Sequence, residues 1–278
     1  MVEHGPAEHG PVENGPVENG PVESLNGFFD GPLPRIFAHR GWAADAPENT
    51  LLAFAAALAL GITHCETDVH ASVDGVPVVS HDADLARTAG VAGRIDQLSF
   101  AELQKIDLGR GQSYPSLQEA LCAFPEARFN IDLKSDGAVA PAVEAIRSAQ
   151  ATHRVLLTSF DNARRLRAVR LLPGVATSAS ALPFAIALLA VTLGIVPLAR
   201  HVLRGMQAVQ VPERIRGLRV VSARSVRLLK KCGVEVHVWT INDPAAMTRL
   251  LDLGVDALIT DRPDLALEII RARLASRE

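Results

Sequence analysis

The sequence predicts an α/β protein with a TIM (β/α)8 barrel, and three observations support this. From Arg35 onward, short apolar runs alternate with longer stretches of helical period. There are eight such runs, more than an open doubly wound sheet needs. The 244 residues from Arg35 to Glu278 match the length of one barrel. The expected strands are Ile36–His39, His64–Val69, Phe129–Leu133, Val155–Ser159, Gly174–Thr177, Met206–Val211, Val234–Trp239 and Ala257–Thr260.

The segments between these strands carry helix signals. Two capping boxes and one proline at a first helical position mark helix starts, and three glycines mark helix ends. The starts are Ser99 with Glu102, Ser116 with Glu119, and Asp243 with Pro244; the ends are Gly61, Gly233 and Gly254.

One spacing between strands is too long for a single helix. The residues from His81 to Phe129 must contain more than one element, and the Asp74-Gly75 turn followed by an apolar run predicts an extra strand over Val76–Ser80. We therefore predict an insertion after the second barrel strand. Such insertions beside a barrel mouth commonly shape access of the substrate.

The N-terminal segment is a repeat. Residues 2–21 are four copies of a five-residue unit, VEHGP, AEHGP, VENGP and VENGP. The recurring Gly-Pro prevents regular helices and sheet ladders, and one Val or Ala per unit buries too little surface to offset the ordering entropy. We predict that residues 1–34 form a disordered low-complexity tail with a lead-in, and that residues 35–278 form the barrel.

A long uncharged stretch lies in the second half of the chain. No residue from Leu171 to Ala199 is charged, and this length could span a bilayer. Two prolines and a glycine interrupt its apolar core, Ala181–Ala199, and the strand and helix pattern continues on both sides, so we expect helices that pack on the barrel. The alternative is contact of residues 181–204 with a membrane surface, because Arg200 and Arg204 follow the apolar run.

Charge and cysteine content exclude several classes of protein. The 28 Lys and Arg nearly balance the 31 Asp and Glu, so nothing indicates a nucleic-acid partner. The three cysteines are widely spaced, which fits neither a disulfide framework nor a thiolate metal site. The first 30 residues lack the basic and apolar regions of a secretory signal. We expect a cytoplasmic protein, with peripheral membrane contact as the alternative; the oligomeric state stays open.

Three acidic residues on adjacent predicted strands face one place. Alternate residues of a strand share a face, so Glu66 and Asp68 point together, and Asp132 and Lys134 point away from the apolar residues of their own strand. Three carboxylates inside a barrel repel one another unless a positive charge compensates, and oxygen ligands suit Mg²⁺ or Ca²⁺. The sequence therefore predicts one divalent cation. The alternative is a structural ion-pair cluster with Lys134 and buried arginines.

Two histidines come at the carboxyl ends of predicted strands, where barrel active sites form. His39 ends the first strand and His81 ends the extra strand, so both could move protons near neutral pH. The alternative is a structural hydrogen bond for each. Arg40 could bind a phosphate or hold a carboxylate.

These residues lie in motifs that resemble the glycerophosphodiester phosphodiesterase family. The motifs follow the family's order from near Arg35 almost to the C-terminus, and the ordered set is specific although each motif is short. They are Ala38-His39-Arg40-Gly41, Pro47-Glu48-Asn49-Thr50, Glu66-Thr67-Asp68, Asp74-Gly75 with Pro77-Val78-Val79-Ser80-His81-Asp82, Asn130-Ile131-Asp132-Leu133-Lys134, Val238-Trp239-Thr240-Ile241-Asn242 and Ile259-Thr260-Asp261-Arg262-Pro263.

The resemblance implies a metal-dependent hydrolase that converts small glycerophosphodiesters to glycerol phosphate and an alcohol. Site residues are implied position by position, with Asp132 standing where the family usually has Glu. The implied roles are general base and acid for His39 and His81, metal ligands for Glu66, Asp68 and Asp132, phosphate binding for Arg40 and Lys134, and a pocket wall for Trp239.

Two alternatives remain beside this reading. Related barrels resemble lysophospholipase D, which would act on lysophospholipids at a membrane surface. A barrel that binds phosphoesters without turnover is the other, because of the departure at Asp132. The choice between Mg²⁺ and Ca²⁺, the alcohol head group, and the attacking oxygen, from water or from the substrate's glycerol hydroxyl, stay open.

Overall fold

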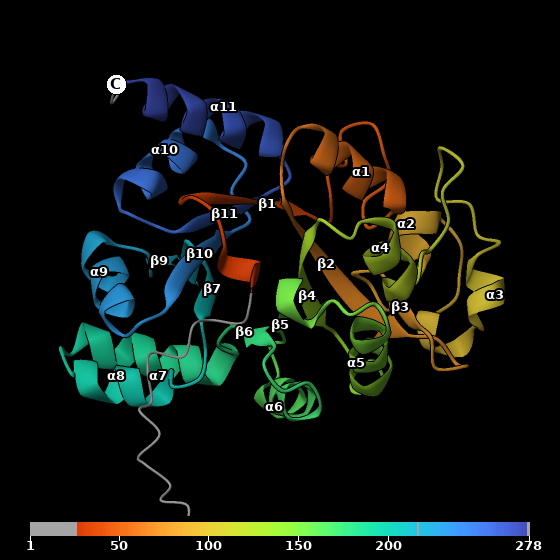
Figure 1. Ribbon diagram of the computed structural model, residues 1–278, viewed down its shortest axis with the longest axis horizontal. Coiled ribbons are helices and arrows are strands. Elements are labelled where there is room, and N and C mark those ends of the chain that lie inside the picture. Colours follow the sequence, from red (N-terminus) through yellow and green to blue (C-terminus); the bar gives the residue numbers. More distant parts are fainter. Residues whose placement is uncertain (1–26, 216, 277–278) are drawn as a thin grey trace, which may run out of the picture.

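The computed structural model describes residues 27–215 and 217–276, so the predicted repeat tail of residues 2–21 lies outside the described residues. Within the described part, helices surround a nearly closed parallel barrel (Figure 1). All eight predicted barrel strands are present. They are β1 (Arg35–His39), β2 (His64–Ala71), β4 (Arg128–Leu133), β5 (Val155–Thr158), β6 (Ala176–Thr177), β7 (Ala208–Pro212), β10 (Glu235–Trp239) and β11 (Ala257–Thr260).

The strands follow the barrel order β6-β5-β4-β2-β1-β11-β10-β7. A parallel bridge between Ser178 and Ala208 joins the two ends of this order, beside β6 and β7. The register pairs Glu66 with Asn130 and Asp68 with Asp132, so β2 and β4 align their polar residues on one face. The fold prediction is confirmed.

The outer layer consists of helices, and the main core lies between them and the outward strand faces, where Ile131 and Leu133 are buried. The capping boxes at Ser99 and Ser116 are both formed. The helices of this layer are α1 (Leu51–Ala59), α4 (Leu117–Ala123), α5 (Val139–Ser148), α6 (Asn162–Leu171), α7 (Ala181–Thr192), α8 (Val196–Val202), α9 (Ala223–Lys231), α10 (Pro244–Asp252) and α11 (Pro263–Ala275).

The predicted insertion follows β2. Its strand β3 (Pro77–Val79) pairs antiparallel with β2, and the short elements α2 (Ala86–Ala89), η2 (Ile95–Gln97) and α3 (Phe100–Leu103) follow. A separate small core around Tyr114 and Leu103 holds them. A second hairpin, β8 (Arg214–Ile215) with β9 (Leu218–Arg219), follows β7 and was not predicted.

The amino-terminal end of the barrel is closed by residues that the sequence analysis assigned to the lead-in. The 3-10 helix η1 (Gly27–Phe29) places Phe28, which is fully buried, against Phe37 and His64 of the strands. A second short element, η3 (Thr152–Arg154), contacts η1. The folded unit therefore begins at least as early as Gly27, eight residues before the predicted boundary at Arg35. The sequence analysis did not predict this contact, because the segment has only a few apolar residues and Pro-rich segments flank it.

The long uncharged stretch forms the two surface helices α7 and α8, which lie side by side (Figure 1). No helix in the described ranges has both the length and the apolar composition needed to cross a membrane.

Candidate active site

One cavity of about 660 Å³ lies at the carboxyl ends of the barrel strands. Strand alternation and the turn after β3 bring together side chains that are far apart in the sequence. All eight side chains that the sequence analysis selected line it: His39, Arg40, Glu66, Asp68, His81, Asp132, Lys134 and Trp239.

The three carboxylates are buried and only partly compensated. Lys134 Nζ lies 2.8 Å from Asp68 Oδ1 and 2.7 Å from Asp132 Oδ2, so it bridges two of them. Arg40 adds a weaker contact, with Nε 3.5 Å from Asp68 Oδ2. Glu66 Oε2 accepts one hydrogen bond at 3.1 Å from the backbone N–H of Arg40. Asp132 Oδ1 is buried and has no hydrogen-bond partner.

The pKa values reflect this uneven compensation. Burial raises the pKa of Glu66 above its ordinary value, and the charge of Asp68 raises it further. Burial also raises the pKa of Asp132. Burial alone would raise the pKa of Asp68 too, but the ammonium of Lys134 outweighs it and holds that pKa low. Of the three carboxylates, Asp68 is therefore the one that the cations of the cavity floor stabilise most in its ionised form.

His39 is held by a chain of hydrogen bonds from the neighbouring strands. Its Nδ1 lies 2.6 Å from Asp261 Oδ1, and Asn242 Nδ2 donates to Asp261 Oδ2 at 2.7 Å. This arrangement leaves Nε2, which lies 3.9 Å from Glu66 Oε2, available to the cavity. Burial lowers the pKa of His39, but the hydrogen bond to Asp261 and the charge of Glu66 outweigh it, so the pKa is raised.

His81 is held by a second chain that runs through the insertion. Its Nδ1 lies 2.6 Å from Asp82 Oδ1. Arg87 of α2 bonds both Asp82 and Glu48, and Glu48 in turn accepts a 3.0 Å hydrogen bond from Arg40. Both histidines thus have one ring nitrogen fixed by a carboxylate, which orients the other toward the cavity.

The turn after β1 brings Arg40 into the cavity by an unusual backbone path. Arg40 has a positive φ of 58°, and Gly41 follows with a φ of 80°. A Cβ at Gly41 would lie 2.7 Å from the backbone of Ala53, so only glycine fits this close approach. Asn49 braces the same region, because its amide donates to Asp68 and its carbonyl oxygen accepts from Thr67.

The donor set fits a hard divalent cation in residue type. Three carboxylates share the floor, one oxygen of Asp132 is orphaned, and burial together with the charge of Asp68 raises the pKa of Glu66. As the side chains stand, Lys134 occupies the space between Asp68 and Asp132, and no three His, Cys, Asp or Glu side chains of the described ranges are close enough together to hold a metal.

Aromatic and aliphatic side chains form one part of the cavity wall. Trp239 packs edge-on against Phe160 at 6.0 Å between ring centroids, and Lys134 Nζ lies 5.9 Å from the Phe160 ring. Phe184 and Leu188 of α7 extend this wall away from the carboxylates. A polar floor therefore meets an apolar wall at Lys134 and Trp239.

Several supporting residues were not selected from the sequence. Asp261 and Asp82 could have been, because one directly follows the last barrel strand and the other directly follows His81. Arg87 gave no signal, because its role depends on how the insertion folds back. Phe160 and Phe184 look like ordinary core residues in the sequence.

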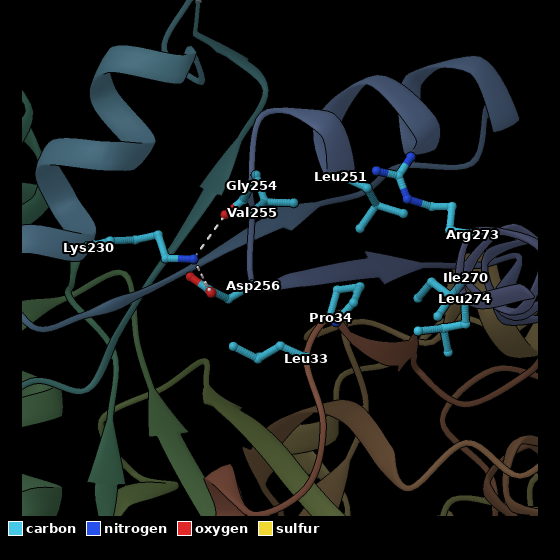
Figure 2. A pocket seen from close by; sticks show the side chains of 10 residues that line it. All are labelled: Leu33, Pro34, Lys230, Leu251, Gly254, Val255, Asp256, Ile270, Arg273 and Leu274. Atoms are coloured by element: carbon cyan, nitrogen blue, oxygen red, sulfur yellow. Dashed lines mark hydrogen bonds and ion pairs between the residues drawn. The ribbon is translucent and has the colours of Figure 1, made fainter. Parts of the chain in front are cut away.

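A second, smaller cavity of about 190 Å³ lies between α9 and α11, near the start of β11 (Figure 2). Its lysine, Lys230, donates to Asp256 Oδ1 at 2.7 Å and to the carbonyl of Gly254 at 3.1 Å. Its main polar groups therefore satisfy one another, and none of the selected residues lines it.

Known proteins are similar to this chain in both sequence and fold. Residues 39–265 match the Glycerophosphoryl diester phosphodiesterase family. The chain is 42% identical to a Mycobacterium tuberculosis protein named "Probable glycerophosphodiester phosphodiesterase 2", covering 85% of this chain and 90% of that protein. It is 29% identical to a Bacillus altitudinis glycerophosphodiester phosphodiesterase, covering 85% and 98%.

The fold is similar to the solved structure of an Oleispira antarctica phosphodiesterase in complex with the product sn-glycerol-3-phosphate. The TM-score is 0.73 at 28% identity, covering 86% of this chain and 97% of that one. Sequence and fold agree, and the chain belongs to the glycerophosphoryl diester phosphodiesterase family.

Proposed function

We propose that this phosphodiesterase hydrolyses glycerophosphodiesters to glycerol phosphate and an alcohol by acid-base catalysis of His39 and His81 beside one divalent cation. The observation that carries the proposal is the arrangement of the two histidines. Each has one ring nitrogen bonded to a carboxylate, and both line the cavity that contains Glu66, Asp68 and Asp132.

The phosphodiester would bind at the border between the polar floor and the apolar wall. Arg40 and Lys134 supply positive charge there, and Trp239 would contact the carbon skeleton of the substrate. Both cations already face carboxylates, so they are held in place before the substrate arrives.

One general base and one general acid account for the proton movements. His39 takes the proton of the attacking hydroxyl while its oxygen bonds to phosphorus, and its raised pKa makes it a stronger base. The bond from phosphorus to the alcohol oxygen breaks, and His81 gives that oxygen a proton. Whether the attacking oxygen comes from water or from the substrate's glycerol hydroxyl through a cyclic phosphate that water opens, the reaction consumes one water.

Glu66, Asp68 and Asp132 would hold the cation. When bound, the ion supplies positive charge that stabilises the negative charge on the phosphoryl oxygens. Asp68 and Asp132 would then bind both the cation and Lys134, so the Lys134 ammonium could also contact a phosphate oxygen. Acid-base catalysis gives about 3–5 kcal/mol, whereas enzymes lower barriers by about 8–23 kcal/mol, so charge stabilisation has to supply a large part.

The test is hydrolysis of glycerophosphocholine and glycerophosphoethanolamine with and without a chelator. We expect glycerol phosphate and the free alcohol, loss of activity on chelation, recovery with Mg²⁺ or Ca²⁺, and a loss of about 10²-fold or more in His39→Ala. His153→Ala, an exposed histidine of η3, is the matched control and should retain activity. Turnover that survives chelation would contradict the cation, and turnover that survives His39→Ala would contradict the base.

We also propose that the barrel with its lead-in carries the activity by itself. A chain that lacks residues 1–24 should keep its kcat/KM and its melting temperature. A large loss of either would assign a catalytic or structural role to the repeats.

A further inference from the structure

Large apolar side chains are exposed together on one part of the molecule. The described residues contain fourteen exposed large hydrophobic side chains, and eight of them surround α7, α8 and the cavity mouth. On α7, Leu182, Ile186, Leu189 and Leu193 follow a spacing of four, three and four residues, which places them on one helix face. Leu182 and Leu193 are 65% and 64% exposed. We define the α7–α8 face as Leu182, Ile186, Leu189, Leu193, Ile195 and Leu198.

This face meets the active-site cavity at Leu189. Leu189 is 61% exposed and also lines the cavity, next to Leu188 and Phe184. Ile215 of the β8–β9 hairpin and Phe160 also line the cavity and are exposed. A water-soluble glycerophosphodiester has a polar glycerol and head group and would leave most of this wall uncovered.

The surroundings of the α7–α8 face are strongly basic. Residues 162–234 contain 13 of the 28 Lys and Arg of the chain but only one of the 31 Asp and Glu, Glu213. Glu213 pairs with Arg249 at 2.8 Å and more loosely with Arg214 and Arg219, at 3.8 and 3.7 Å. Acidic residues outside the segment pair with Arg164, Arg167 and Lys230. Arg200 and Arg204 are exposed on and just after α8, and Arg224 Nη2 donates to the carbonyl of Thr192 at the turn between the two helices. Basic side chains lie on α6, α8, α9 and the segments beside them, while the uncharged α7 contacts all three of these helices (Figure 1).

We propose that the α7–α8 face docks on an anionic lipid bilayer, from which the active site takes a lysophospholipid whose acyl chain lies along Phe184, Leu188 and Leu189. The inference rests on the proposed function and adds the surface and the substrate class. Basic side chains around an apolar face match a surface with negative head groups over a hydrocarbon interior. A second copy of this chain would place two such basic regions against each other, so charge disfavours it as the occupant.

Hydrolysis of a lysophospholipid at the docked surface consumes one water, as hydrolysis of a glycerophosphodiester does. The oxygen of one water ends on phosphorus, the bond from phosphorus to the head-group oxygen breaks, and His81 protonates that oxygen. The products are an acylglycerol phosphate, which keeps its acyl chain on the apolar wall, and the free head-group alcohol.

The test compares the full chain with Leu182→Ser/Leu193→Ser, two substitutions on the α7–α8 face that do not line the cavity. Sedimentation uses vesicles of phosphatidylcholine and phosphatidylglycerol in equal parts, or of phosphatidylcholine alone. We expect the unchanged chain to pellet with the anionic vesicles, and the variant to lose at least about tenfold in vesicle affinity. Hydrolysis of vesicle-bound lysophosphatidylcholine should fall in parallel, while hydrolysis of soluble glycerophosphocholine is unchanged.

Val73→Ser/Leu274→Ser is the matched control, because these side chains are 62% and 54% exposed but lie outside the basic residues 162–234. It should bind vesicles like the unchanged chain. Arg200→Glu/Arg204→Glu should fail to bind the anionic vesicles at every salt concentration tested.

The proposal is overturned if the unchanged chain stays in solution with anionic vesicles, or if the leucine variant pellets equally well. It is also overturned if sedimentation velocity shows a dimer that the leucine variant dissociates, since a second copy would then cover the face. Sedimentation needs no turnover, so a chain that binds vesicles but hydrolyses no glycerophosphodiester would contradict the proposed function and leave the docking surface standing.

Discussion

The two ends of the barrel bury the same kinds of side chain but compensate them differently. At the amino-terminal end, both oxygens of Glu235 accept hydrogen bonds from Arg35, at 2.6 and 2.7 Å, and His237 bonds the same carboxylate at 3.0 Å. At the carboxyl-terminal end, one oxygen of Asp132 has no partner and the pKa of Glu66 is raised by burial.

This difference separates stability from function within one fold. A buried carboxylate whose two oxygens both have cationic partners can hold a structure together, whereas one with an oxygen left without a partner costs stability and is retained where a ligand completes it. The amino-terminal end is also closed by Phe28, while the carboxyl-terminal end opens into the cavity. We therefore expect substitutions at the two ends to act on different measurements.

The largest effect should come from the two histidines of the proposed mechanism. His39→Ala and His81→Ala each remove a proposed proton-transfer group and should lower kcat by about 10²–10⁴-fold. Their melting temperatures should fall far less than that of a core variant, because both rings line the cavity. A thermal melt beside the hydrolysis assay checks this, and a histidine variant that loses both activity and stability would remove the contrast between the two ends.

The opposite result is expected at the closed end. Phe28→Ala removes a fully buried ring that contacts Phe37 and His64, and it should lower the free energy of unfolding by about 3–5 kcal/mol. Well below its melting temperature the variant should keep its kcat. Denaturant unfolding with activity measured on the same sample is the check, and a Phe28→Ala enzyme of full stability and low kcat would be inconsistent with this division.

The closed end should also give the stability a pH dependence. Burial lowers the pKa of His64 to about 3, and its Nε2 bonds the carbonyl of Phe28. In the unfolded chain His64 is protonated as the pH falls below about 6.5, whereas in the folded chain it stays neutral until about pH 3. The contribution of neutral His64 to the free energy of unfolding is therefore complete above pH 6.5 and decreases as the pH falls toward 3. From pH 6.5 to pH 5 the loss is about 2 kcal/mol.

Unfolding free energies of the unchanged chain and of His64→Gln, measured over this pH range, test the assignment. The glutamine does not titrate but can still donate to the Phe28 carbonyl, so the variant should show the shallower pH slope. Equal slopes would mean that His64 is not the group responsible.

The smallest effect is expected from the support of His39. Asp261→Asn weakens a charge-assisted hydrogen bond, worth about 1.5–3 kcal/mol, and should lower kcat by about tenfold or somewhat more without a change in KM. Its pH profile should shift as well, because the lost negative charge lowers the pKa of His39 and moves the acidic limb of kcat/KM to lower pH. A change in KM alone would show that Asp261 serves substrate binding instead.

The sequence predicted the barrel because strands and helices repeat with clear periods and glycine or proline boundaries. It also predicted the acidic cluster, since alternation along β2 and β4 assigns Glu66, Asp68 and Asp132 to one face. Both kinds of prediction depend on local pattern only.

Features that depend on distant contacts were not accessible in this way. The plug at Phe28 is a single turn whose burial depends on strands elsewhere in the chain, and Arg87 reaches Asp82 and Glu48 only after the insertion has folded back. The apolar composition of residues 181–199 was evident, but the exposure of Leu182 and Leu193 could not be separated from the burial of Phe184 and Ala187.

The most direct test of the central claim is calorimetric titration of chelator-treated protein with Mg²⁺ and with Ca²⁺, without substrate. We expect one bound ion per chain, loss of binding in Asp132→Asn, and undiminished binding in Glu235→Gln, which changes a paired carboxylate at the closed end. Absence of binding by the unchanged chain, or equal binding by Asp132→Asn, would contradict the claim that a cation completes the partly compensated carboxylates of the open end.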